Sequence, residues 1–122
     1  MFHWSDKIRQ EFRNPKNIGE LDVSKANVYL AEVKTPDGFT HMQLFIEIKD
    51  EKIVNAKFKV LGCPCCIACL SYLTQQLTGR DAIELKQISA QNLIGTLELP
   101  KERYSSALLA EELCKNLFKQ VF

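Results

Sequence analysis

Residues 53–69 read IVNAKFKVLGCPCCIAC, and this stretch decides the fold because a strand pattern passes directly into a helix pattern. Apolar and polar side chains alternate through its first half, as in a strand with one covered face. The apolar set is Val54, Ala56, Phe58 and Val60, and the polar set is Asn55, Lys57 and Lys59. Pro64 suits a first helical position, which places Cys63 at the N-cap. We therefore predict that a strand ends just before Cys63 and that a helix begins directly after it.

Working outward from this stretch, the same alternation occurs over residues 42–48, and residues 28–33 are rich in strand formers. The turn signal of residues 35–38 and the short link of residues 50–52 join these segments as hairpins. Gly79 fits the end of the helix that follows Cys63, at about Leu77. Three consecutive strands with short links predict a three-stranded antiparallel sheet.

Helices account for much of the remaining sequence. Ser5 is a suitable cap for a helix over residues 6–13, and Asp81 and Glu84 have capping-box spacing for a short helix. A 3.6-residue period predicts a last helix whose apolar stripe is Leu108, Leu109, Leu113, Leu117 and Val121. We predict an α+β fold, with the helices packed on one face of the antiparallel sheet.

The composition suits one soluble domain spanning residues 1–122. Hydrophobic residues make up 46% and charged residues 25%, and the net charge is +1. A net charge this close to zero gives no strong positive electrostatic field that would attract nucleic acid or an anionic membrane surface. The apolar runs are too short to span a bilayer, and the first residues lack a secretory signal pattern, so we expect a cytoplasmic protein.

Four of the five cysteines lie within seven residues: Cys63, Cys65, Cys66 and Cys69. Crowded cysteines close no long loop, so a thiol or metal site is a better interpretation than a disulfide framework. At a helix N-terminus, partial positive charge favours the thiolate, the form that binds soft metal ions or accepts sulfane sulfur. We predict that these four cysteines form the cofactor and metal site. The pattern leaves open which of them are ligands.

The other sulfur and imidazole groups have less distinctive settings. Cys114 lies in the apolar stripe of the last helix and is expected in the core. His41 begins a strand and is either a surface histidine or a further ligand, and His3 is expected at the surface. Thiol-redox chemistry and simple packing are the alternatives to a metal site for the cysteine cluster.

Several segments resemble the NifU N-terminal/IscU family of iron–sulfur cluster assembly scaffolds. Residues 12–21, FRNPKNIGEL, are similar to the family's "ENPRNVGSLD", and residues 53–63 to "I-x-x-A-x-F-K-x-x-G-C". Residues 98–100 and 109–112 resemble its "ELPPVK…HCS-x-LAED" region. The resemblance covers nearly the whole length and implies an N-terminal helix, a three-stranded antiparallel sheet and helices on one face.

The same resemblance implies a function. Members of the family receive sulfur from a cysteine desulfurase, build a [2Fe–2S] cluster on three cysteines and often a histidine, and pass it to acceptor proteins. Of these ligand positions only Cys63 matches. The first family cysteine falls on Gly38, the His-Cys pair falls on Ser105 and Ser106, and the aspartate associated with cluster lability falls on Thr40.

We therefore expect a variant scaffold or carrier, not an enzyme, that binds iron or an Fe–S cluster through the cysteine run. Its partners would be a cysteine desulfurase and Fe–S acceptor proteins, and the oligomeric state is open. Ser105 and Ser106 are expected to take no part in metal binding. Two alternatives remain: a regulator that binds the desulfurase without building clusters, and a zinc or thiol-redox module on the same fold.

Overall fold

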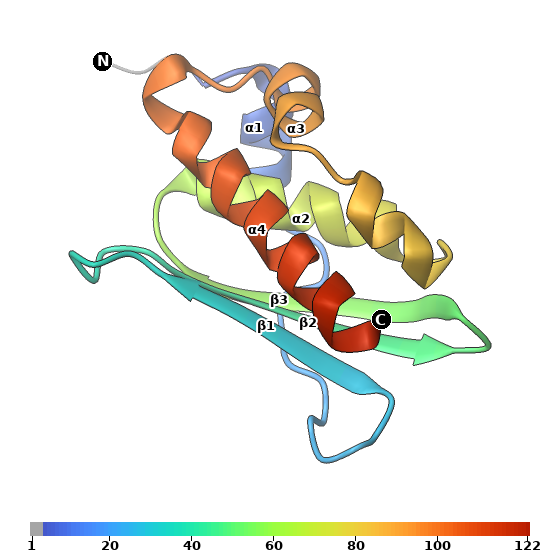
Figure 1. The fold of residues 1–122 in the computed structure, drawn as a ribbon. Helices are drawn as coiled ribbons and strands as arrows, with labels where there is room; N and C mark the ends of the chain where they lie inside the picture. The colour runs from blue at the N-terminus through green and yellow to red at the C-terminus, as the bar shows by residue number, and fades with distance from the viewer. Residues whose placement is uncertain (1–3) are drawn as a thin grey trace.

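The computed structural model describes residues 4–122, and its centre is a sheet of three antiparallel strands in chain order (Figure 1). The strands are β1 (Val28–Lys34), β2 (His41–Lys49) and β3 (Lys52–Leu61). Asp50 and Glu51 alone form the link between β2 and β3, with positive φ angles of 51° and 65°. Two consecutive residues of this kind make the tight turn whose twist matches a hairpin.

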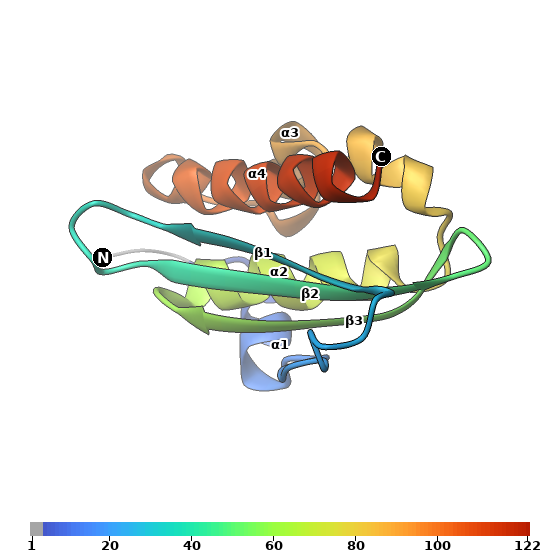
Figure 2. The ribbon, with the colours of Figure 1, turned by 60° about the horizontal axis from the view of Figure 1, so that its bottom comes forward.

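The helices are α1 (Asp6–Arg13), α2 (Pro64–Leu77), α3 (Ala90–Leu97) and α4 (Tyr104–Val121), with the short 3-10 helices η1 (Ala82–Gln87) and η2 (Lys101–Arg103). Helix α2 packs on β3 and α4 packs on β1, both on the same face of the sheet (Figures 1 and 2). Helix α1 packs against α2. The predicted α+β fold with helices on one sheet face is confirmed.

The predicted helix ends are confirmed where a cap was recognisable. Ser5 accepts a hydrogen bond from the backbone N–H of Ile8 at 3.1 Å, and Cys63 is the N-cap of α2. Gly79 follows the end of α2 with a φ of +92°, a conformation that costs glycine little. Beside Asp81, the Glu84 carboxylate accepts a hydrogen bond from the Asp81 N–H at 3.3 Å, although the helix there is 3-10 rather than α.

The predicted alternation in β3 is wrong at its first residue. Val54 is 43% exposed, whereas Ile53 is fully buried. The cause is a β-bulge: Glu47 pairs with Asn55 but the next residue, Ile48, pairs with Ile53, so Val54 has no partner. One extra residue in a strand reverses the side-chain faces before it.

The predicted stripe on the last helix is also wrong at one position. Leu108 is 56% exposed, and the buried stripe of α4 is made of Ser106, Ala107, Ala110, Leu113, Cys114 and Leu117. The placement of Cys114 in the core is confirmed, because its side chain is fully buried. This stripe faces the core, where α4 packs against β1 and α2.

One core contains side chains from the inner face of the sheet and from α1, α2, η1, α3 and α4. The strand edge of β3 is covered by an upstream segment: the N–H of Gly19 donates to the carbonyl of Phe58, and the N–H of Phe58 donates to the carbonyl of Asn17. No helix within residues 4–122 is long and apolar enough to cross a membrane.

Candidate functional site: a thiol cluster at the mouth of a groove

The site begins where β3 ends and α2 begins, next to two other chain segments. The β1–β2 turn and the N-terminal two-thirds of α4 reach the same place and enclose a groove of about 830 Å³. Its lining includes Asp37 and Phe39 from the turn, the N-cap Cys63 and Cys66 at the start of α2, and Ser105 and Ser106 from α4. Segments far apart in the sequence therefore share one concave surface.

Within this groove Cys63 and Cys66 present their sulfur atoms to each other at 3.7 Å. The Ser106 hydroxyl lies 3.4 Å from the Cys66 sulfur and 3.8 Å from the Cys63 sulfur. Residues three apart at the start of a helix share one face, which is why these two thiols meet. Cys63 is half-buried, whereas Cys66 is only 3% exposed.

The other two clustered cysteines turn toward the protein interior. Cys65 and Cys69 are fully buried, belong to the hydrophobic core and do not line the groove. Gly62, just before the cluster, faces Cys66: a Cβ at this position would lie 3.1 Å from the Cys66 sulfur. A larger residue at Gly62 would therefore displace the thiol that faces the groove.

The four thiols differ in acidity. Hydrogen bonds from Cys65, Cys66 and Ser106 to the Cys63 sulfur hold the pKa of Cys63 well below its ordinary value. The interaction with Cys63 and burial raise the pKa of both Cys65 and Cys66. Burial, and then the charge of Cys63, raise the pKa of Cys69 to about 12. These shifts favour the thiolate at Cys63, the most accessible of the four sulfurs, and the protonated thiol at the other three.

Sequence reasoning missed Arg103, which lines the groove. Its positive charge acts on Cys65, where it lowers the pKa against the stronger raising effects. The signal available in the sequence was a cation placed directly before the last helix. Phe39 was missed as well: it is 77% exposed at the rim, next to Gly38.

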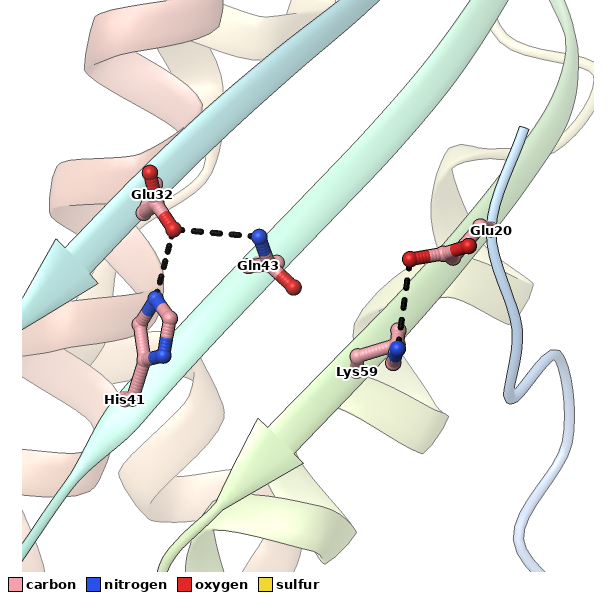
Figure 3. Close-up of polar contacts among 5 residues, drawn as sticks. All are labelled: Glu20, Glu32, His41, Gln43 and Lys59. Atoms are coloured by element: carbon pink, nitrogen blue, oxygen red, sulfur yellow. Dashed lines mark hydrogen bonds and ion pairs between the residues drawn. The ribbon is translucent and has the colours of Figure 1, made fainter. Parts of the chain in front are cut away.

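His41 does not line this groove. His41 lies on the opposite face of the sheet, where its Nε2 is 2.6 Å from Glu32, which also accepts a hydrogen bond from Gln43 (Figure 3). His41 is therefore not placed to be a ligand in the groove, and the prediction of a surface histidine is confirmed. His3 lies outside the described residues.

Two sulfurs in the groove match the spacing that one metal ion requires. Thiolates at about 2.3 Å from a tetrahedral ion lie about 3.8 Å apart, close to the 3.7 Å between Cys63 and Cys66. Within residues 4–122, no group of three or more His, Cys, Asp or Glu side chains is arranged to hold an ion. The groove thus offers two protein ligands side by side, and the four-cysteine ligand set stays a prediction.

Comparison with known proteins links this chain to a family. The family described as "NifU-like N terminal domain" matches residues 3–120. The iron–sulfur cluster assembly scaffold protein IscU of Rickettsia prowazekii is 35% identical over 113 residues, covering 92% of this chain and 86% of that protein. IscU of Escherichia coli K12 is 33% identical, covering 92% of this chain and 88% of that protein.

Solved structures agree on the fold. A putative iron–sulfur cluster assembly scaffold protein for the SUF system from Fervidobacterium islandicum has a TM-score of 0.74 at 16% identity, covering 94% of this chain and 96% of that chain. A NifU-like N-terminal protein from Brucella abortus has a TM-score of 0.71 at 17% identity, covering 95% and 94%. With nearly the full chain matched in sequence and in fold, this protein belongs to the NifU-like N-terminal domain family.

Proposed function

We propose that this protein acts in iron–sulfur cluster assembly as a variant scaffold or carrier that holds iron or an Fe–S cluster in the groove. The observation that carries the proposal is the pair of sulfurs of Cys63 and Cys66, 3.7 Å apart and both facing the groove. Thiolate sulfur is the ligand that iron–sulfur clusters require. The bacterial relatives named as assembly scaffolds support the same function.

The resemblance to the family supports this groove as the ligand site, although two of the family's three cysteine positions are changed. Gly38 and Ser106 stand at the family's first and third cysteine positions. Ser106 lies within 3.8 Å of both sulfurs, and residues 37 and 39, on either side of Gly38, line the same groove. We propose that Cys63 and Cys66 supply two ligands and that inorganic sulfide or an acceptor protein supplies the others.

This role involves no turnover of a substrate, so we propose a non-enzymatic protein. A cysteine desulfurase would supply the sulfur and Fe–S apoproteins would receive the product, by analogy with the family. The cytoplasm is the proposed compartment, since neighbouring free thiols persist where the environment is reducing. Thr40, at the family's position for an aspartate associated with cluster lability, favours slow release.

The proposal is tested by anaerobic reconstitution of reduced protein with ferrous iron and inorganic sulfide. We expect visible absorption from sulfur-to-iron charge transfer, together with bound iron and sulfide after desalting. Cys63→Ala and Cys66→Ala should each lose most of this absorption. Cys114→Ala is the matched control, because it removes a buried thiol that does not line the groove and should keep the spectrum.

Two further variants define the ligand set. Cys69→Ala should keep the spectrum if the groove pair is the site, and should lose it if the buried cysteines are ligands. Ser106→Cys, which restores a thiol at a family position, should increase the iron retained. Colourless protein that binds one zinc ion, or wild type that retains no metal, would contradict the proposal in favour of a zinc module or a regulator, respectively.

A further inference from the structure

The pair Cys63–Cys66 has a second chemical capacity that metal binding does not use. Two thiols that share one helix face are placed for thiol–disulfide exchange as well as for metal binding. Cys63 is the N-cap of α2 and Cys66 lies in its first turn, and no disulfide is formed between them. A sulfur–sulfur distance of 3.7 Å requires only a small rotation of either side chain before a bond forms.

The two thiols differ in solvent exposure, and this difference gives each a separate role in a reaction with a sulfur donor. Cys63 is half-buried at the mouth of the groove, so a sulfur donor reaches it first. Cys66 is 3% exposed, so an outside donor cannot reach it, but it is in contact with Cys63. An accessible thiol that accepts a group and a protected thiol that resolves it is the usual arrangement of a reactive dithiol.

We infer that Cys63 and Cys66 convert sulfane sulfur into sulfide inside the groove, where the cluster is to be built. The inference rests on the proposed function, because it assumes that the sulfur delivered to Cys63 is destined for a cluster. A cluster contains sulfide, whereas a persulfide donor delivers sulfur at the oxidation level of zero. Two electrons per sulfur atom must therefore be supplied, and this dithiol holds two.

The first step is transfer of one sulfur atom from a protein or low-molecular-weight persulfide. The Cys63 thiolate attacks the outer sulfur of the donor, the donor's S–S bond breaks, and the donor leaves as its thiol. Cys63 then carries the persulfide. The departing thiolate takes the proton of the donor's persulfide, and Cys63 keeps the negative charge on its new outer sulfur, so charge and atoms balance.

The second step is reduction of that sulfur by Cys66. The Cys66 sulfur attacks the inner sulfur, Sγ of Cys63, and the bond to the outer sulfur breaks. The outer sulfur leaves as hydrosulfide and takes the Cys66 proton, while a Cys63–Cys66 disulfide forms. The sulfane sulfur gains two electrons and each cysteine sulfur loses one. A dithiol reductant then restores both thiols, which allows them to bind iron.

The geometry favours Cys66 over Cys65 as the resolving thiol, although Cys65 also interacts with Cys63. Cys65 is fully buried and does not line the groove, whereas the Cys66 sulfur lies in the groove 3.7 Å from the Cys63 sulfur. Cys66 lines the groove and contacts the Ser106 hydroxyl at 3.4 Å. That hydroxyl is placed to donate a hydrogen bond to departing hydrosulfide.

The test is a single-turnover reaction of reduced, metal-free protein with one equivalent of glutathione persulfide, under anaerobic conditions and without added reductant. We expect about one sulfide released per chain, together with a Cys63–Cys66 disulfide located by peptide mass mapping. Cys66→Ala should retain the extra sulfur atom on Cys63 and release about tenfold less sulfide than wild type. Cys63→Ala should show neither product.

Cys114→Ala is the matched control, because it removes a fully buried thiol that does not line the groove while leaving the pair intact, and it should release sulfide like wild type. Sulfide release by Cys66→Ala at the wild-type rate, or a disulfide mapped to any other pair, would overturn the inference. Iron binding is measured separately, with sulfide supplied directly. Loss of persulfide reduction with a normal iron spectrum therefore refutes this inference alone, and the converse result refutes the proposed function alone.

Discussion

At the scale of single residues, Cys114 shows how a buried thiol links stability to pH. Its side chain is fully buried in α4, and burial, with a smaller contribution from the charge of Glu111, raises its pKa from 9.0 to about 12. Between these two values the unfolded chain releases the proton and the folded chain keeps it. The folded state is therefore favoured below pH 9 and loses this advantage as the pH rises toward 12.

We predict that Cys114→Ala flattens this alkaline loss. At pH 8 the variant should be less stable than wild type by about 1 kcal/mol, because a buried atom is removed from the core. Between pH 8 and pH 10 wild type should lose about 1 kcal/mol more than the variant, since a shifted pKa changes stability by about 1.4 kcal/mol per pH unit. Urea unfolding at the two pH values measures both differences.

A control separates titration from packing in this experiment. Leu117→Ala truncates a neighbouring buried side chain of α4 but keeps the thiol. It should be destabilised at both pH values and should keep the wild-type alkaline loss. An unchanged gap between wild type and Cys114→Ala at pH 8 and pH 10 would show that Cys114 titrates alike in both states.

At the scale of elements, Ser71 holds α1 and the following loop against α2. Its side chain is fully buried, its hydroxyl accepts from the Lys16 N–H at 2.9 Å, and it donates to the Glu11 carboxylate at 2.6 Å. Gln75 donates to the same carboxylate at 2.9 Å. A helix that buries serine on this face needs such partners, because a buried hydroxyl without them is costly.

We predict that Ser71→Ala destabilises the protein by about 2 kcal/mol, because the Lys16 N–H loses its acceptor and Glu11 loses a charge-assisted hydrogen bond. Hydrogen exchange should show faster exchange at the Lys16 amide, and urea unfolding should give the free-energy change. Ser105→Ala, at an exposed position, is the matched control and should change stability by less than about 0.5 kcal/mol. Equal stability of the two variants would show that the bridge contributes nothing.

At the scale of the whole molecule, one core joins α1, α2, η1, α3 and α4 to the inner sheet face. We predict that the chain unfolds as a single domain in one cooperative transition, as most chains of this size with one core do. Trp4 packs against the core near α1, so its fluorescence reports on the N-terminal end. Its urea midpoint should coincide with that of far-UV circular dichroism, and an earlier fluorescence transition would mean that α1 separates first.

The helix ends were the part of this fold that could be predicted from single residues. Ser5, Cys63 with Pro64, and Gly79 mark helix ends through their own capping and backbone preferences. The bulge that exposes Val54 was not predictable in this way, because the side-chain pattern around it reads as unbroken alternation. The exposure of Leu108 depends on how α4 is rotated about its axis against the sheet. The 3.6-residue period of the apolar residues does not define that rotation to within one residue.

The sequence by itself determined the family, the order of strands and helices, and the presence of four thiols at one helix start. Only the tertiary structure decided which thiols share a site, because Cys63 and Cys66 face the groove whereas Cys65 and Cys69 pack into the core. It also brought Ser106, forty residues after Cys66, to 3.4 Å from that sulfur. Helix geometry orders neighbours along one chain segment, but contacts between distant segments arise from packing α4 against α2 over the sheet.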